Sequence, residues 1–180
     1  SIIRNKLKLN LHKIFARKCK IVELSNEQFN EFLDKNHISG GVRSSIRLGL
    51  IYENKIVSVL GLRKPLQKKW NGYFEISRFA SQLNTTVIGG LSKFLNHIEK
   101  ELKIQNIMTY ADRRFGEGKS YDKCGFKLVG DTGIDYWYTD CDIRIDRSKL
   151  QSHQNQSEAD MAIEIGLLKI HGCGSNIYIK

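Results

Sequence analysis

Proline and cysteine are scarce in this 180-residue chain, and long apolar runs are missing. Pro65 is the only proline, and the four cysteines form no CxxC pair. Scattered cysteines argue against a zinc ribbon or a disulfide framework and favour reduced thiols in a cytosol. No apolar run approaches the roughly 18 residues that a membrane-spanning helix needs. Because the pattern of a secretory signal is also missing, we expect a cytoplasmic protein with no membrane partner.

Acidic residues are in short supply as well. The chain has 29 Lys and Arg residues against 19 Asp and Glu residues, a net charge of +10. The excess lies in residues 1–20, with seven cations and no acid, and in residues 43–69, with seven cations and one acid. Clustered cations are typical of proteins that bind a polyanion, because bound phosphates release counterions. A solvated basic arm would produce the same pattern.

Hydrophobic periodicity predicts alternating helices and strands. The predicted helices are 2–15, one that begins after the N-cap Ser25, 86–103, 118–124 and 157–167. The predicted strands are 19–24, 46–52, 56–62, 73–79, 106–111 and a pair within 126–139. We expect an α+β layered fold around one sheet. The expected divisions are a basic helix or linker over 1–17, a core over 18–141, and a C-terminal extension over 142–180 that packs on the core.

The turn before the longest predicted helix is rich in glycine. It reads Thr85-Thr86-Val87-Ile88-Gly89-Gly90. Glycine lets the backbone approach a ligand, and a helix start offers free N–H groups and the positive end of the dipole. A pyrophosphate would suit this position. Many strand–helix turns also need glycine for steric reasons alone.

A second segment, Tyr121-Asp122-Lys123-Cys124-Gly125-Phe126, lies on a short predicted helix before a strand. Together with the preceding strand, glycine turn and helix, it resembles the GNAT superfamily of acyltransferases over residues 19–140. The resemblance implies a mixed, mostly antiparallel sheet flanked by helices. The C-terminal residues themselves predict a small appended helix and hairpin, with the hairpin turn at 172–174. The resemblance also implies acetyl-CoA as cofactor, Tyr121 as the acid that protonates the departing thiolate, and Glu75 as general base. The implied cofactor-binding residues are Val87, Ile88, Gly89, Gly90, Leu91 and Ser92.

The chain departs from the GNAT pattern Gln/Arg-x-x-Gly-x-Gly/Ala at two positions. Thr86 stands at the basic or amide position, and Leu91 stands at the last small position. Tyr121 also has a structural alternative, as a core tyrosine at the end of its helix.

A narrower resemblance spans nearly the whole chain. Five segments carry it: 16–19, 36–40, 76–79, 87–93 and 110–114. The tail adds Glu158, Met161, Gly166 and 169–174. They are similar to the C-terminal region of phage-encoded homing-endonuclease-like proteins, which resembles the GNAT-like core of phage DNA-modifying Mom proteins. This resemblance implies DNA as partner, a nuclease domain upstream, and a phage or mobile element in a bacterial host. The sequence contains no GIY-YIG, LAGLIDADG or HNH motif, and no histidine spacing that indicates a metal site.

Arginines near predicted strand ends form a third group. Arg78 lies within a strand, and Asp112, Arg113 and Arg114 follow a strand end, where open sheets place ligands. Arginine suits phosphate, and we expect Asp112 to pair with Arg78 or Arg113. A salt-bridged sheet edge is the alternative. The predicted nucleic-acid contacts are Arg17, Lys18, His37, Arg43, Arg47, Arg63, Lys64, Lys68, Lys69, Arg78, Asp112, Arg113 and Arg114.

From the sequence we favour a GNAT-like domain of a phage or mobile element that binds DNA. It would be the targeting or accessory part of a homing-endonuclease-type protein. The alternative is an acetyl-CoA-dependent N-acyltransferase with a nucleobase or amine acceptor. A third interpretation is a non-catalytic phage structural protein. The sequence leaves open whether the chain is an enzyme.

Overall fold

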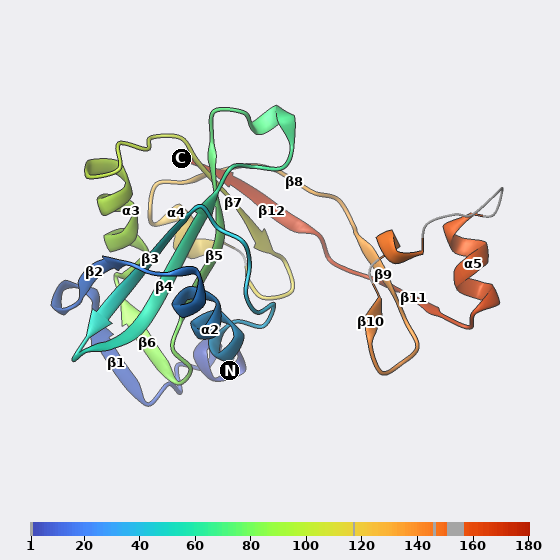
Figure 1. Ribbon diagram of the computed structural model, residues 1–180, viewed down its shortest axis with the longest axis horizontal. Helices are drawn as coiled ribbons and strands as arrows, with labels where there is room; N and C mark the ends of the chain where they lie inside the picture. Colours follow the sequence, from blue (N-terminus) through green and yellow to red (C-terminus); the bar gives the residue numbers. More distant parts are fainter. Residues whose placement is uncertain (1, 117, 146, 151–156) are drawn as a thin grey trace.

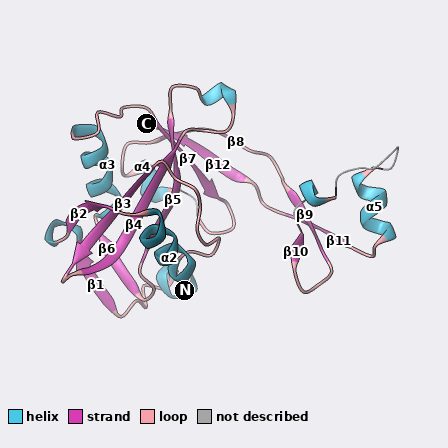
Figure 2. Cartoon of the chain, viewed as in Figure 1, coloured by secondary structure: helices cyan, strands magenta, loops and turns pink. Residues whose placement is uncertain are grey.

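A computed structural model describes residues 2–116, 118–145, 147–150 and 157–180. The body is built on a seven-stranded sheet in the order β2-β3-β4-β5-β7-β12-β8 (Figures 1 and 2). All neighbouring strands are antiparallel except β5 and β7, which are parallel. The predicted α+β fold with a mixed, mostly antiparallel sheet is therefore confirmed. Its strands are β2 (Lys20–Glu23), β3 (Ile46–Tyr52), β4 (Lys55–Arg63), β5 (Phe74–Ser81), β7 (Ile107–Asp112), β8 (Lys127–Asp131) and β12 (Ser175–Ile179).

Helices cover the two faces of this sheet (Figure 2). On one face, α3 (Gly90–Lys100) buries Leu91, Phe94, Leu95 and Ile98 in the larger hydrophobic cluster. On the other face, α2 (Asn26–Asn36) buries its apolar side chains in a second cluster with Val59 and Ala80. The predicted N-cap is confirmed, because Ser25 and Gln28 form a reciprocal capping box. Among the described residues, no helix combines the length and apolar character needed to cross a membrane.

The basic N-terminal segment does not form the helix predicted over 2–15. Only α1 (Ile2–Lys6) is helical, and β1 (His12–Phe15) pairs in parallel with β6 (Thr85–Ile88). A 3-10 turn, Ala16–Lys18, then packs on α3. The prediction is wrong because residues 12–15 and 85–88 satisfy each other's backbone hydrogen bonds across a long sequence separation, which local periodicity does not report.

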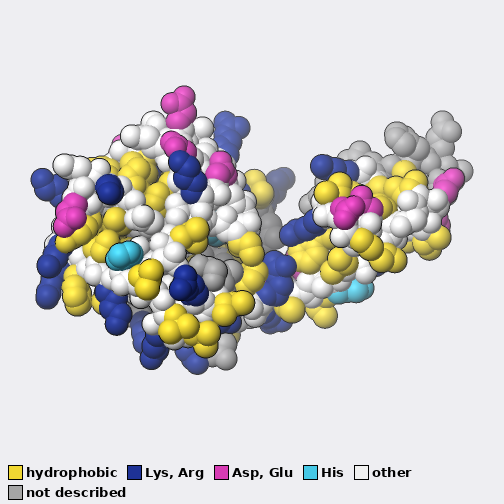
Figure 3. Space-filling view, turned by 90° about the horizontal axis from the view of Figure 1, so that it is seen from below, with side chains coloured by type: hydrophobic (Ala, Val, Ile, Leu, Met, Phe, Trp, Pro, Cys, Tyr) yellow, Lys and Arg dark blue, Asp and Glu magenta, His cyan; other side chains and the backbone are white. Residues whose placement is uncertain are grey.

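The described residues of 132–174 (132–145, 147–150 and 157–174), which we call the arm, project from the body between β8 and β12 (Figures 1 and 3). The arm holds the three-stranded sheet β10-β9-β11 and helix α5. The two strands expected within 126–139 are confirmed, but they do not pair with each other, since they belong to different sheets. The last strand, β12, inserts between β7 and β8 rather than joining an appended extension. The arm elements are β9 (Tyr136–Thr139), β10 (Arg144–Ile145), the 3-10 turn Arg147–Lys149, α5 (Glu158–Glu164) and β11 (Leu168–His171).

Candidate active site

The candidate site lies where β5 and β7 separate. The two strands pair only from Phe74 with Ile107 to Ile76 with Thr109. Past this point β5 continues beside β4, with Ser77 bulged out of register, and β7 continues beside β12. A cavity of about 390 Å³ opens at this separation. Within the described part of the chain, no strand pairs with the facing edges of β5 and β7 there, so their backbone polar groups are available to a ligand.

Both faces of the sheet contribute to the lining of this cavity. Tyr121, on the short helix α4 (Lys119–Asp122), comes from the face covered by α3. His37, at the C-terminal cap of α2, comes from the opposite face. Arg78 of β5 and Asp112 of β7 also line the cavity. The structure therefore brings together four of the residues that the sequence singled out.

Tyr121 combines the two roles that the sequence left open. Its ring packs against Phe126 and Tyr178, with centroids 5.5 and 5.6 Å away. Its Oη lies 3.5 Å from Thr109 Oγ1, which donates to it. Burial raises the pKa of Tyr121, so the phenol remains protonated at neutral pH. The side chain is thus a core residue that also carries a proton at the cavity.

The glycine turn forms the N-terminus of α3. Gly89 is its N-cap, with φ of +77°, and no side chain caps the helix. A Cβ atom on Gly90 would lie 3.3 Å from Val87 Cγ1. Steric constraints therefore explain glycine at both positions, which is the alternative that the sequence left open. The uncapped N–H groups nevertheless leave this helix end suited to an anion.

Basic residues lie beside this helix end. Arg17 and Lys18 are exposed on the 3-10 turn that packs on α3. Lys93 anchors that turn, because its Nζ donates to the carbonyls of Ala16 and Cys19. On the other side, Ser92 Oγ lies 3.3 Å from Cys124 Sγ, next to α4. The helix end and the Tyr121 helix are therefore adjacent.

The other predicted cofactor-binding residues differ in accessibility. Val87 and Ile88 belong to β6, and Ile88 is exposed. Leu91 is buried in the core. Of the predicted six, Gly89 and Ser92 are exposed at the start of α3, whereas Gly90 and Leu91 are buried.

Glu75 does not line the cavity. It is 5% exposed, and its Oε1 lies 2.6 Å from Arg63 Nη2. A carboxylate held this way is a structural partner of Arg63, and the geometry gives it no access to an incoming amine. Of the two residues predicted to be catalytic, only Tyr121 lines the cavity.

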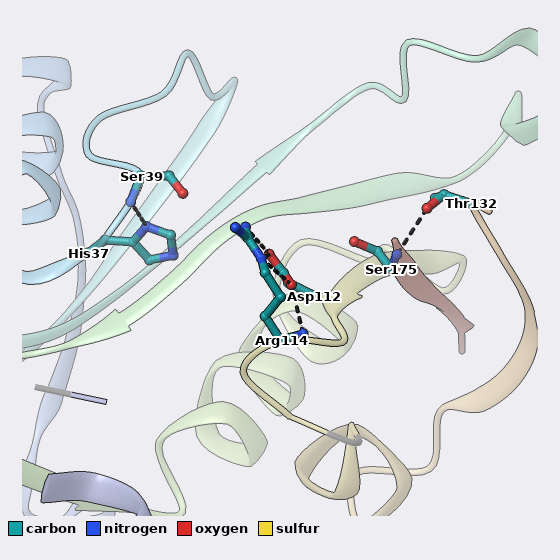
Figure 4. A network of polar contacts seen from close by, with 6 residues as sticks. All are labelled: His37, Ser39, Asp112, Arg114, Thr132 and Ser175. Carbon is teal, nitrogen blue, oxygen red and sulfur yellow. Dashed lines mark hydrogen bonds and ion pairs between the residues drawn. The ribbon is translucent and has the colours of Figure 1, made fainter. Parts of the chain in front are cut away.

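Arg78 and His37 form the polar wall on the α2 face. Arg78 Nη1 donates to the Ser77 carbonyl at 2.8 Å, and its Nε is buried without a hydrogen-bond partner among the described residues. His37 Nδ1 accepts from the Ser39 backbone N–H at 3.1 Å (Figure 4). Burial and then Arg78 lower the pKa of His37, which makes the neutral ring the main form at pH 7.

Asp112 pairs with neither Arg78 nor Arg113, and that expectation is wrong. Arg114 closes back on Asp112, with Nη2 to Oδ2 at 2.6 Å and Nε to Oδ1 at 3.0 Å (Figure 4). These hydrogen bonds lower the pKa of Asp112. Arg114 lies only two residues after Asp112, the last residue of β7, so its side chain can turn back to the carboxylate. The side chain of Arg113 points instead towards Asp131 and Asn176 and contacts both.

The remaining predicted nucleic-acid contacts do not form one surface. Arg47 donates to the carbonyls of Ser44 and Leu24, and Arg63 is held by Glu75. The loop after β4 and the N-terminal strand β1 lie at opposite ends of the body in Figure 1. The exposed cations are Arg17 and Lys18 near β1, Arg43, and Lys64, Lys68 and Lys69 in the loop after β4.

Two residues of the site were not predicted from the sequence. Thr109, the partner of Tyr121, lies on the same face of β7 as the buried Ile107 and is itself only 1% exposed. A polar side chain on the apolar face of a strand was a readable signal. Ser39 fixes the His37 ring through its backbone N–H, for which the sequence held no signal.

Comparison with solved structures identifies the fold. The Bacillus subtilis acetyltransferase in complex with CoA matches at 17% identity and a TM-score of 0.53, over 90% of this chain and 97% of that one. The Escherichia coli ribosomal-protein-S18-alanine N-acetyltransferase matches at 12% identity and a TM-score of 0.51, over 77% and 99%. Arabidopsis thaliana Naa50, in complex with the bisubstrate analogue CoA-Ac-MVNAL, matches at 13% and 0.51, over 91% and 98%.

The chain has the GNAT fold, as the Tyr121 segment and the glycine turn predicted. A scan against models of protein families and a search of curated proteins found no match. The narrower resemblance to phage homing-endonuclease-like and Mom proteins receives no support from the structures compared.

Proposed function

We propose that this protein is an acyl-CoA-dependent N-acyltransferase, the alternative interpretation of the sequence. The observation that carries the proposal is the cavity between β5 and β7, which is lined from both faces of the sheet. Tyr121 lies on the face where the donor would enter, and Arg78 and His37 lie on the face where an amine would enter. The GNAT fold supports the same reaction class.

The residues present suit acetyl-CoA. The free edges of β5 and β7 offer backbone N–H and carbonyl groups, which pair well with an extended chain that carries amides, such as pantetheine. The uncapped N-terminus of α3, with Arg17 and Lys18 beside it, suits the phosphates. Bound acetyl-CoA supplies an acyl thioester, whose carbonyl carbon accepts the amine and whose sulfur leaves as a thiolate.

Tyr121 is the acid of the proposed reaction. Its Oη holds a proton at neutral pH because burial raises the pKa. Thr109 donates to that oxygen, so the phenol proton is free to point elsewhere. Tyr121 gives this proton to the departing sulfur as the C–N bond forms and the C–S bond breaks. The amine's own proton leaves to water, and Tyr121 regains one from water.

The amine must enter the cavity already neutral. Asp112 is the only carboxylate among the described residues that line the cavity, and Arg114 occupies both of its oxygens. His37 is neutral, but Ser39 engages its Nδ1, so its proton lies on Nε2. Glu75 is held by Arg63. This set favours amines of low pKa, such as an α-amino group with a pKa near 8, over the lysine side chain.

Calorimetric titration tests the proposal. The protein should bind CoA with a micromolar dissociation constant, and acetyl-CoA with amines should release free thiol. Titration of a DNA duplex provides the comparison, since charge-driven binding should weaken steeply with salt. Absence of CoA binding, together with salt-dependent DNA binding, would return the chain to the DNA-binding interpretation.

A further inference from the structure

The part of the cavity that the structure describes contains one positive charge without a carboxylate partner. Among the described residues, Arg78 forms no ion pair, whereas Arg63 is held by Glu75 and Arg114 by Asp112. One hydrogen bond of Arg78 is known, to the Ser77 carbonyl, and its buried Nε has none. A guanidinium carries five N–H donors in a planar fork, and the hydrogen bond to Ser77 uses one of them.

The surroundings of Arg78 are unfavourable to a lone cation. Burial and then the neighbouring Arg63 lower the pKa of Arg78, more than Glu75 raises it. His37, on the facing loop, cannot compensate, because its neutral ring presents Nε2–H as a donor. Both groups therefore offer donors to the same cavity. An oxyanion would satisfy the fork and relieve the charge.

The dimensions and the walls of the cavity indicate a small ligand. Its volume of about 390 Å³ lies at the lower end of the range of roughly 300–1,000 Å³ for small-molecule sites. Ile76, Phe79 and Phe115 give it apolar walls beside the polar group. Figure 4 shows that His37 and Ser39 approach from one side while Asp112, Arg114 and Ser175 lie on the other.

We propose that the acceptor is a small amine that also carries a carboxylate or a phosphate, and that Arg78 binds this anionic group with help from His37 Nε2–H. The inference rests on the proposed acyltransferase function and names its substrate class. An anionic group held at Arg78 would fix the amine within the cavity, on the side opposite Tyr121. The apolar walls would accept the carbon part of the molecule.

Pairs of amines with and without the anion provide the test, and the two members are compared at equal concentrations of the neutral amine so that their different pKa values do not contribute. Tryptophan and tryptamine test a carboxylate, and phosphoethanolamine and ethanolamine test a phosphate. The wild-type protein should prefer the anionic member of at least one pair by about 10- to 100-fold in kcat/KM, the range for hydrogen bonds to a charged group. The pair that shows the preference identifies the anion.

Arg78→Gln should abolish this preference by raising KM for the anionic amine while leaving the neutral amine unchanged. Arg78→Lys should restore part of it, because charge returns without the fork. Lys55→Gln, at the exposed first position of β4, is the matched loss of charge and should behave as wild type. Far-ultraviolet circular dichroism checks that the variants fold. If Arg78→Gln fails to fold, Arg78→Lys replaces it in the comparison.

Binding gives a readout that is independent of turnover. Titration of each amine into the protein saturated with CoA should show the same preference, and Arg78→Gln should remove it. If CoA binds but no amine pair is discriminated, the anion site is wrong and the acyltransferase proposal stands. If CoA does not bind, the acyltransferase proposal fails on its own evidence. If the protein acylates an oligonucleotide but none of the small amines, and Arg78→Gln abolishes that reaction, the proposal of a small acceptor is wrong.

Discussion

Thr132 and Ser175, 43 positions apart, close the base of the arm with two hydrogen bonds. The Thr132 N–H donates to the Ser175 carbonyl at 3.0 Å, and the Ser175 N–H donates to Thr132 Oγ1 at 2.9 Å. The chain therefore leaves the body and returns to it at adjacent points. Within the described residues, the arm has its own small cluster around Tyr138, Leu150 and Ala162.

This geometry predicts that the body folds without the arm. Replacing residues 134–173 with a two-residue Asn-Gly turn should preserve β8 and β12, because their pairing in the sheet does not involve the arm. We expect a cooperative urea transition and an unchanged affinity for CoA. A shortened chain that is soluble but unfolded would show that the arm supplies stability to the body.

Tyr121→Phe separates catalysis from packing. The variant keeps the ring against Phe126 and Tyr178 and removes only the hydroxyl. Turnover should fall about 100-fold or more, as for the loss of a general acid. The free energy of unfolding should change by about 1 kcal/mol, the scale of one hydrogen bond. Tyr52→Phe, away from the cavity, is the control, and full activity in Tyr121→Phe would exclude the tyrosine as acid.

Gly89→Ala tests whether the turn binds phosphate. At φ of +77° an alanine is strained by about 1 kcal/mol. Gly72 has φ of +91°, and a Cβ atom added there would meet no other atom within 4 Å, so Gly72→Ala is the matched control. Both variants should lose similar stability in urea, whereas only Gly89→Ala should weaken CoA binding. Equal CoA affinity in the two variants would leave the glycine with its steric role alone.

The buried pair of Glu75 and Arg63 should stabilise the fold without driving the reaction. Glu75→Gln leaves Arg63 partly buried without its carboxylate partner. The free energy of unfolding should fall by about 2 kcal/mol. This loss is below the range for fully buried pairs because Arg63 is partly solvated. Turnover per folded molecule should stay within about threefold of wild type. A much larger loss, with stability intact, would restore Glu75 as general base.

His37 should make stability depend on pH. Its pKa is lowered in the folded protein, so the unfolded chain binds the proton more tightly. The free energy of unfolding should therefore decrease as pH falls through 6.5 towards the folded pKa. His37→Asn should flatten this dependence, measured as urea unfolding between pH 7.5 and 5. His12→Asn, at an exposed position on β1, is the control, and an identical slope in His37→Asn and wild type would contradict the prediction.

Local patterns were sufficient for most of the body. The capping box at Ser25, the alternation in 46–52 and the apolar face of α3 each reflect contacts among residues close in sequence, which periodicity reports directly. The Tyr121 helix and the glycine turn were located for the same reason, and they indicated the GNAT fold before any contact was known.

Tertiary structure decided what depends on pairing between distant segments. The sequence by itself determined where strands form, but not that β12 lies between β7 and β8, nor that β1 pairs with β6. It marked Glu75, Arg78 and Asp112 as candidates, but not which arginine each carboxylate would hold. In the folded chain Glu75 pairs with Arg63 and Asp112 pairs with Arg114, so Arg78 has no carboxylate partner among the described residues. The sequence could not predict these pairs, because ion pairing depends on distances of a few ångströms that only the folded chain sets.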